Sequence, residues 1–323
     1  MELILIYSGG EKLNTNCYLI LAHNDPIHLG RLVDRLDYCS DFFIHIDAKS
    51  DIQKFKIPSL ARKNVFFIEK RYPIHWGGYN MVQATLELIK VSMNTGEYQR
   101  FTLLSGNDYP LRNAKSIYNF FEENSEIDFI KGINLDALSK TTYESFFHRA
   151  LDYKLNYDFE LFRYSKLNLL CRNIRNHTFG YLKNHRQKSS EYLPIYSGSQ
   201  WWSITRNTLL MMLDLSKKYS KYMDSFHSIF VPDEKYFHTL YFNLGLGIEN
   251  NPIDIKTFED RSKQTSLLAN LHVIHPSLKK VYVIQDFEFL KAASSKFIFV
   301  RKVNSMDSEE LLDLIDTELL NER

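Results

Sequence analysis

The sequence predicts an α/β fold with a mostly parallel central sheet. Through residues 17–133, short apolar runs of strand length alternate with longer segments in which apolar residues recur at helical spacing. The connections between these segments are short, which is typical of strand–helix–strand units that build a parallel sheet. Hydrophobic residues make up 44% of the 323 residues, which is enough for a substantial core. The chain contains no internal repeat, low-complexity tract or clear linker, so we expect a single domain over residues 1–323.

Five strands and three helices are expected in the first half. The strands are predicted at 17–23, 42–47, 64–69, 101–106 and 128–133, and the helices at 27–37, 78–93 and 116–124. The first helix follows Asp25 and Pro26, a capping residue ahead of a proline at the first helical position. Its apolar face consists of Leu29, Leu32, Val33 and Leu36. Residues 107–110 are expected to form a turn.

The second half has a less regular pattern. Residues 134–192 are rich in Tyr, Asn, Lys and Arg, and we expect a helical insertion that borders a cleft. A strand is then predicted at 196–205, helices at 206–223, 231–244 and 286–293, a basic apolar segment at 297–303, and a terminal helix from residue 308.

The charge balance argues against a general nucleic-acid binder. Lys and Arg number 40 and Asp and Glu 39, so the formal net charge is +1, whereas nucleic-acid-binding proteins usually carry a basic surplus. The cysteines Cys17, Cys39 and Cys171 form no closely spaced pair, which argues against structural zinc and favours reduced thiols in a cytoplasmic protein. No window approaches the ~18 uninterrupted apolar residues of a membrane span.

Polar residues follow several of the predicted strands. His23, Asp47 and the run Ser105–Asp108 each lie at a strand end. Because ligands of open α/β sheets bind beyond the carboxyl ends of the strands, these residues are candidates for a pocket.

Seven segments, in order, resemble the family of core-2/I-branching β-1,6-N-acetylglucosaminyltransferases and peptide O-xylosyltransferases, glycosyltransferase family 14, in its bacterial form. They are YLILAHNDPIHLGRLVDRLD, FFIHIDAKSD, HWGGYNMVQATLELI, FTLLSGNDYPLR, GSQWWSITR, VPDEKYFHTL and FVRKV, and they span residues 18–303. The resemblance implies a GT-A type fold, a single Rossmann-like domain, and an inverting, metal-independent transfer from a UDP-sugar. It also implies a nucleotide-sugar-binding half at 17–133 and an acceptor and catalytic half at 193–323.

Glu234 is the expected catalytic base. An inverting transfer needs one group to remove the proton of the acceptor hydroxyl, and the base of the family falls on this residue. Pro232 suits the first position of a helix, where the helix dipole would keep a carboxylate ionised. The alternative is ordinary capping, for which Asp233 is the better candidate, and Asp233 is also expected near the acceptor.

Basic residues are expected to replace a metal. The chain has no Asp-x-Asp pair, which metal-dependent sugar-nucleotide transferases use to hold Mn²⁺ or Mg²⁺. The resemblance aligns Lys302 with the lysine that neutralises the diphosphate of the leaving UDP. A second basic residue is implied, and Lys279, Lys280 and Arg301 are the candidates. We therefore expect no metal and no cofactor.

The remaining candidates concern the donor and the acceptor. The resemblance implies that His23, Asp47 and Lys49 hold the nucleotide, although a buried, hydrogen-bonded histidine is an equal alternative for His23. Trp76, beside Gly77, is either a stacking platform or a core ring. Asp108 either binds sugar hydroxyls or closes a turn. The other residues expected near the sugar or the acceptor are Ser105, Asn107, Ser199, Gln200, Trp201 and Trp202. Alternation predicts that only one of the two tryptophans faces the cleft.

The expected reaction is transfer of N-acetylglucosamine to a glycan hydroxyl in bacterial surface polysaccharide synthesis. Other donors, such as UDP-xylose, UDP-glucuronate or UDP-galactofuranose, are alternatives, as is a non-catalytic carbohydrate-binding relative. The expected partners are the UDP-sugar and a glycan or lipid-linked oligosaccharide, with no nucleic acid. We expect a cytoplasmic protein at the inner face of the membrane, which the basic, aromatic stretch 145–188 would touch.

Overall fold

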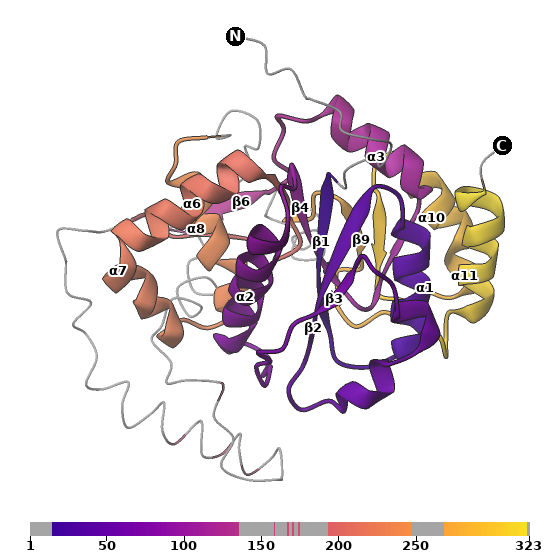
Figure 1. Cartoon of the computed structure of the whole chain (residues 1–323), viewed down its shortest axis with the longest axis horizontal. Coiled ribbons are helices and arrows are strands. Elements are labelled where there is room, and N and C mark those ends of the chain that lie inside the picture. Colours follow the sequence, from indigo (N-terminus) through magenta and orange to yellow (C-terminus); the bar gives the residue numbers. More distant parts are fainter. Residues whose placement is uncertain are drawn as a thin grey trace.

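The computed structural model describes residues 15–135, 193–246 and 268–321, together with Asp158, Leu167, Leu170 and Ile174. A five-stranded sheet of order β3-β2-β1-β4-β8 forms its centre (Figure 1). The strands are β1 (Asn16–Ala22), β2 (Ser40–Ile46), β3 (Val65–Phe67), β4 (Arg100–Ser105) and β8 (Ser203–Thr205). The first four are parallel, and β8 is antiparallel to β4. The predicted mostly parallel sheet is therefore confirmed.

Two helices cover the opposite faces of this sheet. Successive residues of a strand point to opposite faces, and β1 is buried throughout and apolar after Asn16, as expected of a strand covered on both sides. Its residues 17, 19 and 21 pack with α2 (Asn80–Thr95), while 18, 20 and 22 pack with α1 (Pro26–Leu36). The cap of α1 is also as predicted, since the Asp25 side chain accepts a hydrogen bond from the backbone N–H of His28.

A second sheet carries residues that the sequence placed in a turn. Strand β5 (Asp108–Pro110) pairs antiparallel with β10 (Phe299–Arg301), which pairs in parallel with β9 (His272–Ile274). The predicted turn at 107–110 is therefore wrong, because the backbone that leaves β4 finds a partner almost 200 residues further along the chain. Sequence periodicity reports local spacing only, so it cannot predict a pairing between segments so far apart.

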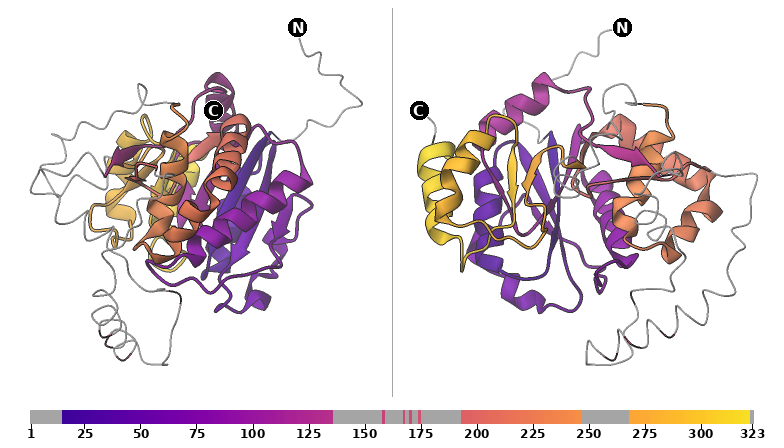
Figure 2. Two further views of the ribbon diagram at one scale, coloured as in Figure 1. Left: turned by 90° about the vertical axis from the view of Figure 1, so that its left-hand side faces the viewer. Right: turned by 180° about the vertical axis from the view of Figure 1, so that it is seen from behind.

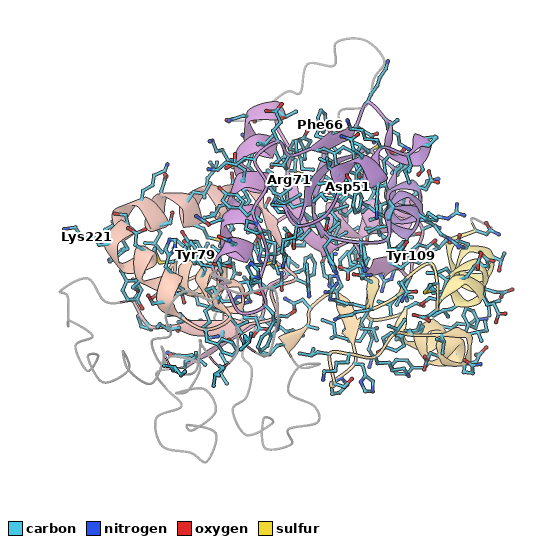
Figure 3. The ribbon with its side chains drawn as sticks, turned by 90° about the horizontal axis from the view of Figure 1, so that it is seen from below. Asp51, Phe66, Arg71, Tyr79, Tyr109 and Lys221 are labelled. Atoms are coloured by element: carbon cyan, nitrogen blue, oxygen red, sulfur yellow. The ribbon has the colours of Figure 1, made fainter. Side chains whose placement is uncertain are left out.

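The C-terminal helices cover this second sheet. They are α10 (Phe287–Ala293), α11 (Glu309–Ile315) and the π-helical turn Asp316–Leu320, and they share a core with β5 and β10. Figure 2 shows α10 and α11 gathered on the side of the molecule that carries α1. A polar network ties them there, since Arg31 of α1 and the hydroxyl of Tyr109 both donate to the Asp316 carboxylate. Figure 3 shows Tyr109 where the N-terminal part of the chain meets the C-terminal helices.

The segment 196–205 divides between two sheets. Its first part is β7 (Tyr196–Gly198), which pairs with β6 (Gly132–Asn134), and its second part is β8. The prediction of one continuous strand is wrong, because the chain crosses from one sheet to the other at residues 199–202. The strand predicted at 128–133 is also shorter, with only an isolated bridge at Phe129 before β6.

The helices α6 (Arg206–Lys218), α7 (Ser220–Asp224) and α8 (Tyr236–Phe242) lie beyond α2 (Figure 1). The helix predicted at 231–244 is instead a 3-10 turn, Pro232–Glu234, followed by α8. In the described ranges the remaining helices are α3 (Ala114–Glu123) and short 3-10 turns at Ile52–Phe55, Pro58–Leu60, Ser225–Ser228 and Ile284–Asp286. Within the described ranges no helix is long and apolar enough to cross a membrane. The insertion expected at 134–192 falls almost wholly outside the described residues.

Candidate active site

A cavity of about 500 Å³ opens at the carboxyl ends of the parallel strands. His23 follows β1, Asp47 follows β2 and Ser105 ends β4, and all three line it. Its other walls come from the turn after residue 74, the segment 198–201, the turn before α8, the loop after β9, and the end of β10. The position agrees with the rule for open α/β sheets, which the sequence prediction used.

Most of the residues predicted for the site line this cavity. They are His23, Asp47, Trp76, Gly77, Ser105, Ser199, Gln200, Trp201, Asp233, Glu234, Lys279, Lys280, Arg301 and Lys302. Lys49, Asn107, Asp108 and Trp202 do not line it. The structure therefore brings together residues that lie far apart in the sequence, while their individual roles remain predictions.

Glu234 projects from an unusual turn. Val231 adopts a left-handed backbone conformation with φ of 51°, and Pro232 starts the 3-10 turn that contains the glutamate. The backbone N–H of Val231 donates to the carbonyl of Gly77 at 3.2 Å, which joins this turn to the His-Trp-Gly-Gly segment. No side-chain cap is made at either the 3-10 turn or α8, so the capping alternatives for Asp233 and Glu234 are wrong.

Two neighbouring carboxylic acids share this wall of the cavity. Burial raises the pKa of Glu234, and the adjacent Lys235 ammonium lowers it. Burial, and then the charge of Glu234, raise the pKa of Asp233. The helix dipole expected to lower the pKa of Glu234 is not present, because the 3-10 turn is only three residues long, and burial raises this pKa instead. A carboxylate with a raised pKa is the stronger base.

Asp108 lies behind Arg301 and is fully buried. One carboxylate oxygen accepts from Arg301 Nη1 at 2.9 Å. The other oxygen accepts from the backbone N–H of Ser105 at 2.7 Å and lies 3.1 Å from His272 Nε2. Neither the sugar contact nor the turn predicted for Asp108 agrees with this position, because its oxygens are bonded within the protein and β5 is extended. Asp108 instead fixes the direction of Arg301.

Arg301 is held on two sides. Its guanidinium carbon lies 4.4 Å from the ring centre of Trp201, a cation–π geometry, and its Nη1 bonds to Asp108. Both Arg301 and Trp201 line the cavity. A guanidinium held in this way presents its remaining N–H groups in a fixed direction, which suits a phosphate.

The three lysines of the cavity differ in their surroundings. Burial and the neighbouring Arg301 lower the pKa of Lys302, while Asp108 raises it. Lys280 forms an ion pair with Asp286 and lies over the Tyr282 ring. Lys279 is exposed at the cavity wall. Arg301, next to Lys302 and already oriented, is the best placed of the three candidates for the second basic residue.

Asp47 organises the edge of the cavity at which the sequence analysis expects the nucleotide. Its Oδ1 accepts hydrogen bonds from the backbone N–H groups of Lys49, at 2.8 Å, and Ile74, at 3.3 Å. Lys49 donates to the Ile74 carbonyl and does not line the cavity, so its side chain stabilises the backbone at residue 74. His23 is exposed at the cavity mouth, which contradicts the buried alternative.

The tryptophans separate as alternation predicted. Trp201 lines the cavity, whereas Trp202 is 1% exposed and packs near Phe237. Trp76 is 75% exposed and contacts the Phe230 ring edge-on, so the core alternative for this residue is wrong. Asn107 instead donates to the carbonyl of Val303.

Sequence reasoning missed several lining residues. His45 lies on β2, two residues before Asp47, and alternation along the extended chain therefore predicts that both face the same side. Its Nε2 accepts from the backbone N–H of Tyr72 at 2.9 Å, and burial lowers its pKa to about 4, so the imidazole is neutral at pH 7. His275, Ser277 and Leu278 also line the cavity from the loop after β9, where no local pattern marked them.

Among the residues that the structure describes, no three His, Cys, Asp or Glu side chains come together as metal ligands would.

Comparisons with known proteins agree with this architecture. A family model described as Core-2/I-Branching enzyme matches residues 17–277, which include most of the cavity walls. Xylosyltransferase sqv-6 of Caenorhabditis elegans is 23% identical over 279 residues, covering 82% of this chain and 31% of the relative.

Mammalian proteins match at similar levels. Xylosyltransferase 2 of Mus musculus is 22% identical over 330 residues, covering 96% of this chain and 34% of the relative. Xylosyltransferase 2 of Homo sapiens is 22% identical over 317 residues, covering 94% and 33%. The chain thus spans about a third of the length of the relatives that it matches.

Proposed function

Because this chain belongs to the Core-2/I-branching enzyme family, a family of glycosyltransferases, we propose that it transfers a sugar from a UDP-sugar to a glycan hydroxyl with inversion at the anomeric carbon. One observation carries the proposal. The same cavity holds the carboxylate of Glu234 on one wall and the cationic groups of Arg301 and Lys302 on another. A base and a pair of cations are what a metal-independent displacement of UDP needs.

In the proposed reaction, Glu234 accepts the proton of the acceptor hydroxyl. The oxygen attacks the anomeric carbon from the face opposite UDP, and a new glycosidic bond forms. The bond between that carbon and the phosphate oxygen breaks, and its electron pair leaves with UDP. Lys302 and Arg301 stabilise the negative charge that develops on the diphosphate. An α-linked donor therefore gives a β-linked product.

Metal independence is part of the proposal, and the cations support it. Lys302 and Arg301 occupy adjacent positions at the end of β10, and Asp108 with Trp201 holds the guanidinium in place. Two positive charges near one diphosphate, one of them held in a fixed direction, would supply the stabilisation that a divalent ion gives elsewhere.

Two donors are favoured. The sequence resemblance and the family description favour UDP-N-acetylglucosamine, and the names of the relatives favour UDP-xylose. UDP-glucuronate and UDP-galactofuranose are further donors to be tested. We propose a role in bacterial surface polysaccharide synthesis in the cytoplasm, on a glycan or lipid-linked acceptor at the membrane surface. This setting rests on the sequence resemblance.

The test is release of UDP by the purified protein from each UDP-sugar, with and without EDTA, in the presence of a panel of mono- and oligosaccharide acceptors. The expected result is turnover of one donor that EDTA does not change. Turnover that EDTA abolishes would overturn the metal-independent mechanism. Binding of glycans with neither UDP binding nor turnover would favour a non-catalytic carbohydrate-binding protein.

A further inference from the structure

Lys235 follows the expected base and is buried. Its exposed fraction is 2%, and it does not line the cavity. Lysine is almost never fully buried unless its charge is paired, because removing an ammonium from water is costly. The mechanism proposed above gives this residue no role. The positive charge beneath the catalytic turn therefore requires an explanation.

The ammonium of Lys235 reaches back across the turn that carries Glu234. Its Nζ donates to the carbonyl of Phe230 at 3.0 Å and to that of Val231 at 3.2 Å. Val231 is a β-branched residue at positive φ, a conformation that is unfavourable unless its surroundings hold it. The two hydrogen bonds clamp the chain on both sides of that strained residue. They thereby fix the direction in which Pro232 and the following acids leave the turn.

The charge of Lys235 also acts on the two acids that precede it in the sequence. Burial lowers the pKa of Lys235, while Glu234 and Asp233 raise it. In return, Lys235 lowers the pKa of both acids against the effect of burial. The other titratable groups around this cluster are His238 on α8, Asp158 beside the start of α2, and His75 and His227, which act on Asp158.

We propose that Lys235 is a positioning residue of the transfer reaction, whose buried ammonium clamps the turn at Val231 and holds a positive charge beneath the Asp233–Glu234 pair. This inference rests on the proposed function, since it takes Glu234 as the base. It assigns to Lys235 no contact with either substrate. Its effect is to set the lowest pH at which the base is in its active, ionised form.

Removing the charge of Lys235 should shift the pH dependence of the rate in one direction only. Without the cation, the carboxylate pair takes up its proton at a higher pH, because a buried negative charge has lost its partner. Below the pKa of a base, each unit of upward shift lowers the ionised fraction, and with it the rate, about tenfold. The loss of activity should therefore be large at low pH and should diminish as the pH rises.

The experiment measures kcat and KM for UDP release across pH 5–9 in Lys235→Met, which keeps the length of the side chain and removes its charge. We expect the low-pH limb of the kcat profile to shift to higher pH by about one unit, which lowers kcat about tenfold at the acid end of the range. The KM of the donor should not change. Lys221→Met is the matched control, because Lys221 is exposed and points away from the molecule (Figure 3), and its profile should equal that of the parent.

Lys235→Arg provides a second measurement if Lys235→Met does not fold. Arginine keeps the charge and can donate to both carbonyls, so its acid limb should stay at the position of the parent even if kcat falls. A uniform loss across pH in Lys235→Met, or an acid limb that moves in Lys235→Arg, would overturn the inference.

Failure of the proposed function gives a different result. If Glu234→Gln keeps its turnover, Glu234 is not the base, whatever the profile of the Lys235 variants. If Glu234→Gln is inactive and Lys235→Met has the pH profile of the parent, the base stands and only the role of Lys235 is wrong.

Discussion

At the scale of single residues, the chemistry of this site depends on what surrounds each charged group. Glu234 and Asp233 are adjacent acids on a buried turn, and burial raises the pKa of both. Asp108 is more deeply buried, yet Arg301 and His272 hold its pKa below the ordinary value against the effect of burial. The sequence showed three acids of similar kind, whereas their environments give them opposite tendencies.

Glu234→Gln is expected to lower kcat by about 10²- to 10⁴-fold, the usual contribution of a general base. Binding of UDP, measured by calorimetry, should not change, because the amide retains the shape of the side chain. In the parent, kcat/KM should fall as the pH drops through a pKa above the ~4.3 of a free glutamate, since burial raises it. Glu123→Gln, an exposed change on α3, should leave both quantities unchanged. Full turnover in Glu234→Gln would exclude it as the base.

Asp108→Asn is expected to weaken UDP binding, because the guanidinium of Arg301 loses the anion that orients it. It should also lower stability by about 3–5 kcal/mol at pH 7, the usual cost of removing one partner of a buried ion pair. Since the pKa of Asp108 is lowered by folding, its stabilisation is present above the unfolded value of ~3.9 and is lost as the pH falls further. The difference in Tm between variant and parent should therefore shrink on acidification below about pH 4. A difference in Tm that is constant with pH would contradict this account.

At the scale of elements, local pattern predicted most helices and strands but not the breaks between them. The apolar face of α1 and the strands β1, β2 and β4 lie close to where periodicity placed them. Segments 196–205 and 231–244 were each predicted as one element and are each divided. In both cases the break lies at the cavity, where the backbone turns residues 199–201 or Glu234 toward it. Periodicity cannot reveal such a break, because the residues on either side keep the same pattern.

Gly77→Ala is expected to disturb the contact between two loops. Gly77 has φ of 79°, and a Cβ there would lie 2.6 Å from the ring of Phe230, the residue before the Val231 turn. Gly245 has a similar φ of 75°, with nothing within 4 Å of the added carbon. Gly245→Ala should therefore lower the free energy of unfolding only by the backbone strain, about 1 kcal/mol. Urea unfolding should show a greater decrease in the free energy of unfolding for Gly77→Ala than for Gly245→Ala. The kcat of Gly77→Ala should also be lower. Equal decreases in the free energy of unfolding in the two variants would mean that the Phe230 ring moves aside without an energetic cost.

At the scale of the whole molecule, the site exists because two sheets meet. The five-stranded sheet supplies His23, Asp47 and Ser105, while β10 of the second sheet supplies Arg301 and leads into Lys302. The link between the sheets is the chain that leaves β4 and enters β5, reinforced by Arg31 and Tyr109 on Asp316. The distance and orientation between the strand-end residues of the first sheet and the cations of the second are thus a property of the assembled molecule.

Asp316→Ala is expected to lower the free energy of unfolding by about 2 kcal/mol, less than for a fully buried pair because Arg31 and Arg35 are partly exposed. It should weaken UDP binding, because the second sheet carries the cations. Asp313 also bonds to Arg31 but is 67% exposed, so Asp313→Ala should cost less than about 1 kcal/mol. Urea unfolding and calorimetry check both variants, and equal effects would show that the buried network does not join the sheets.

The sequence by itself determined the α/β class, the alternation of strands and helices that builds a parallel sheet, and the edge of the sheet at which polar residues collect. These follow from periods of two and 3.6 residues and from the direction of parallel strands, which are local properties. Only the tertiary structure decided that Asp108 is buried behind Arg301, that residues 108–110 join a second sheet, and that the Lys235 ammonium bonds to the carbonyls of the turn before Glu234. Those facts depend on pairings between distant segments, where burial and the nearest opposite charge, rather than residue type, determine what a side chain does.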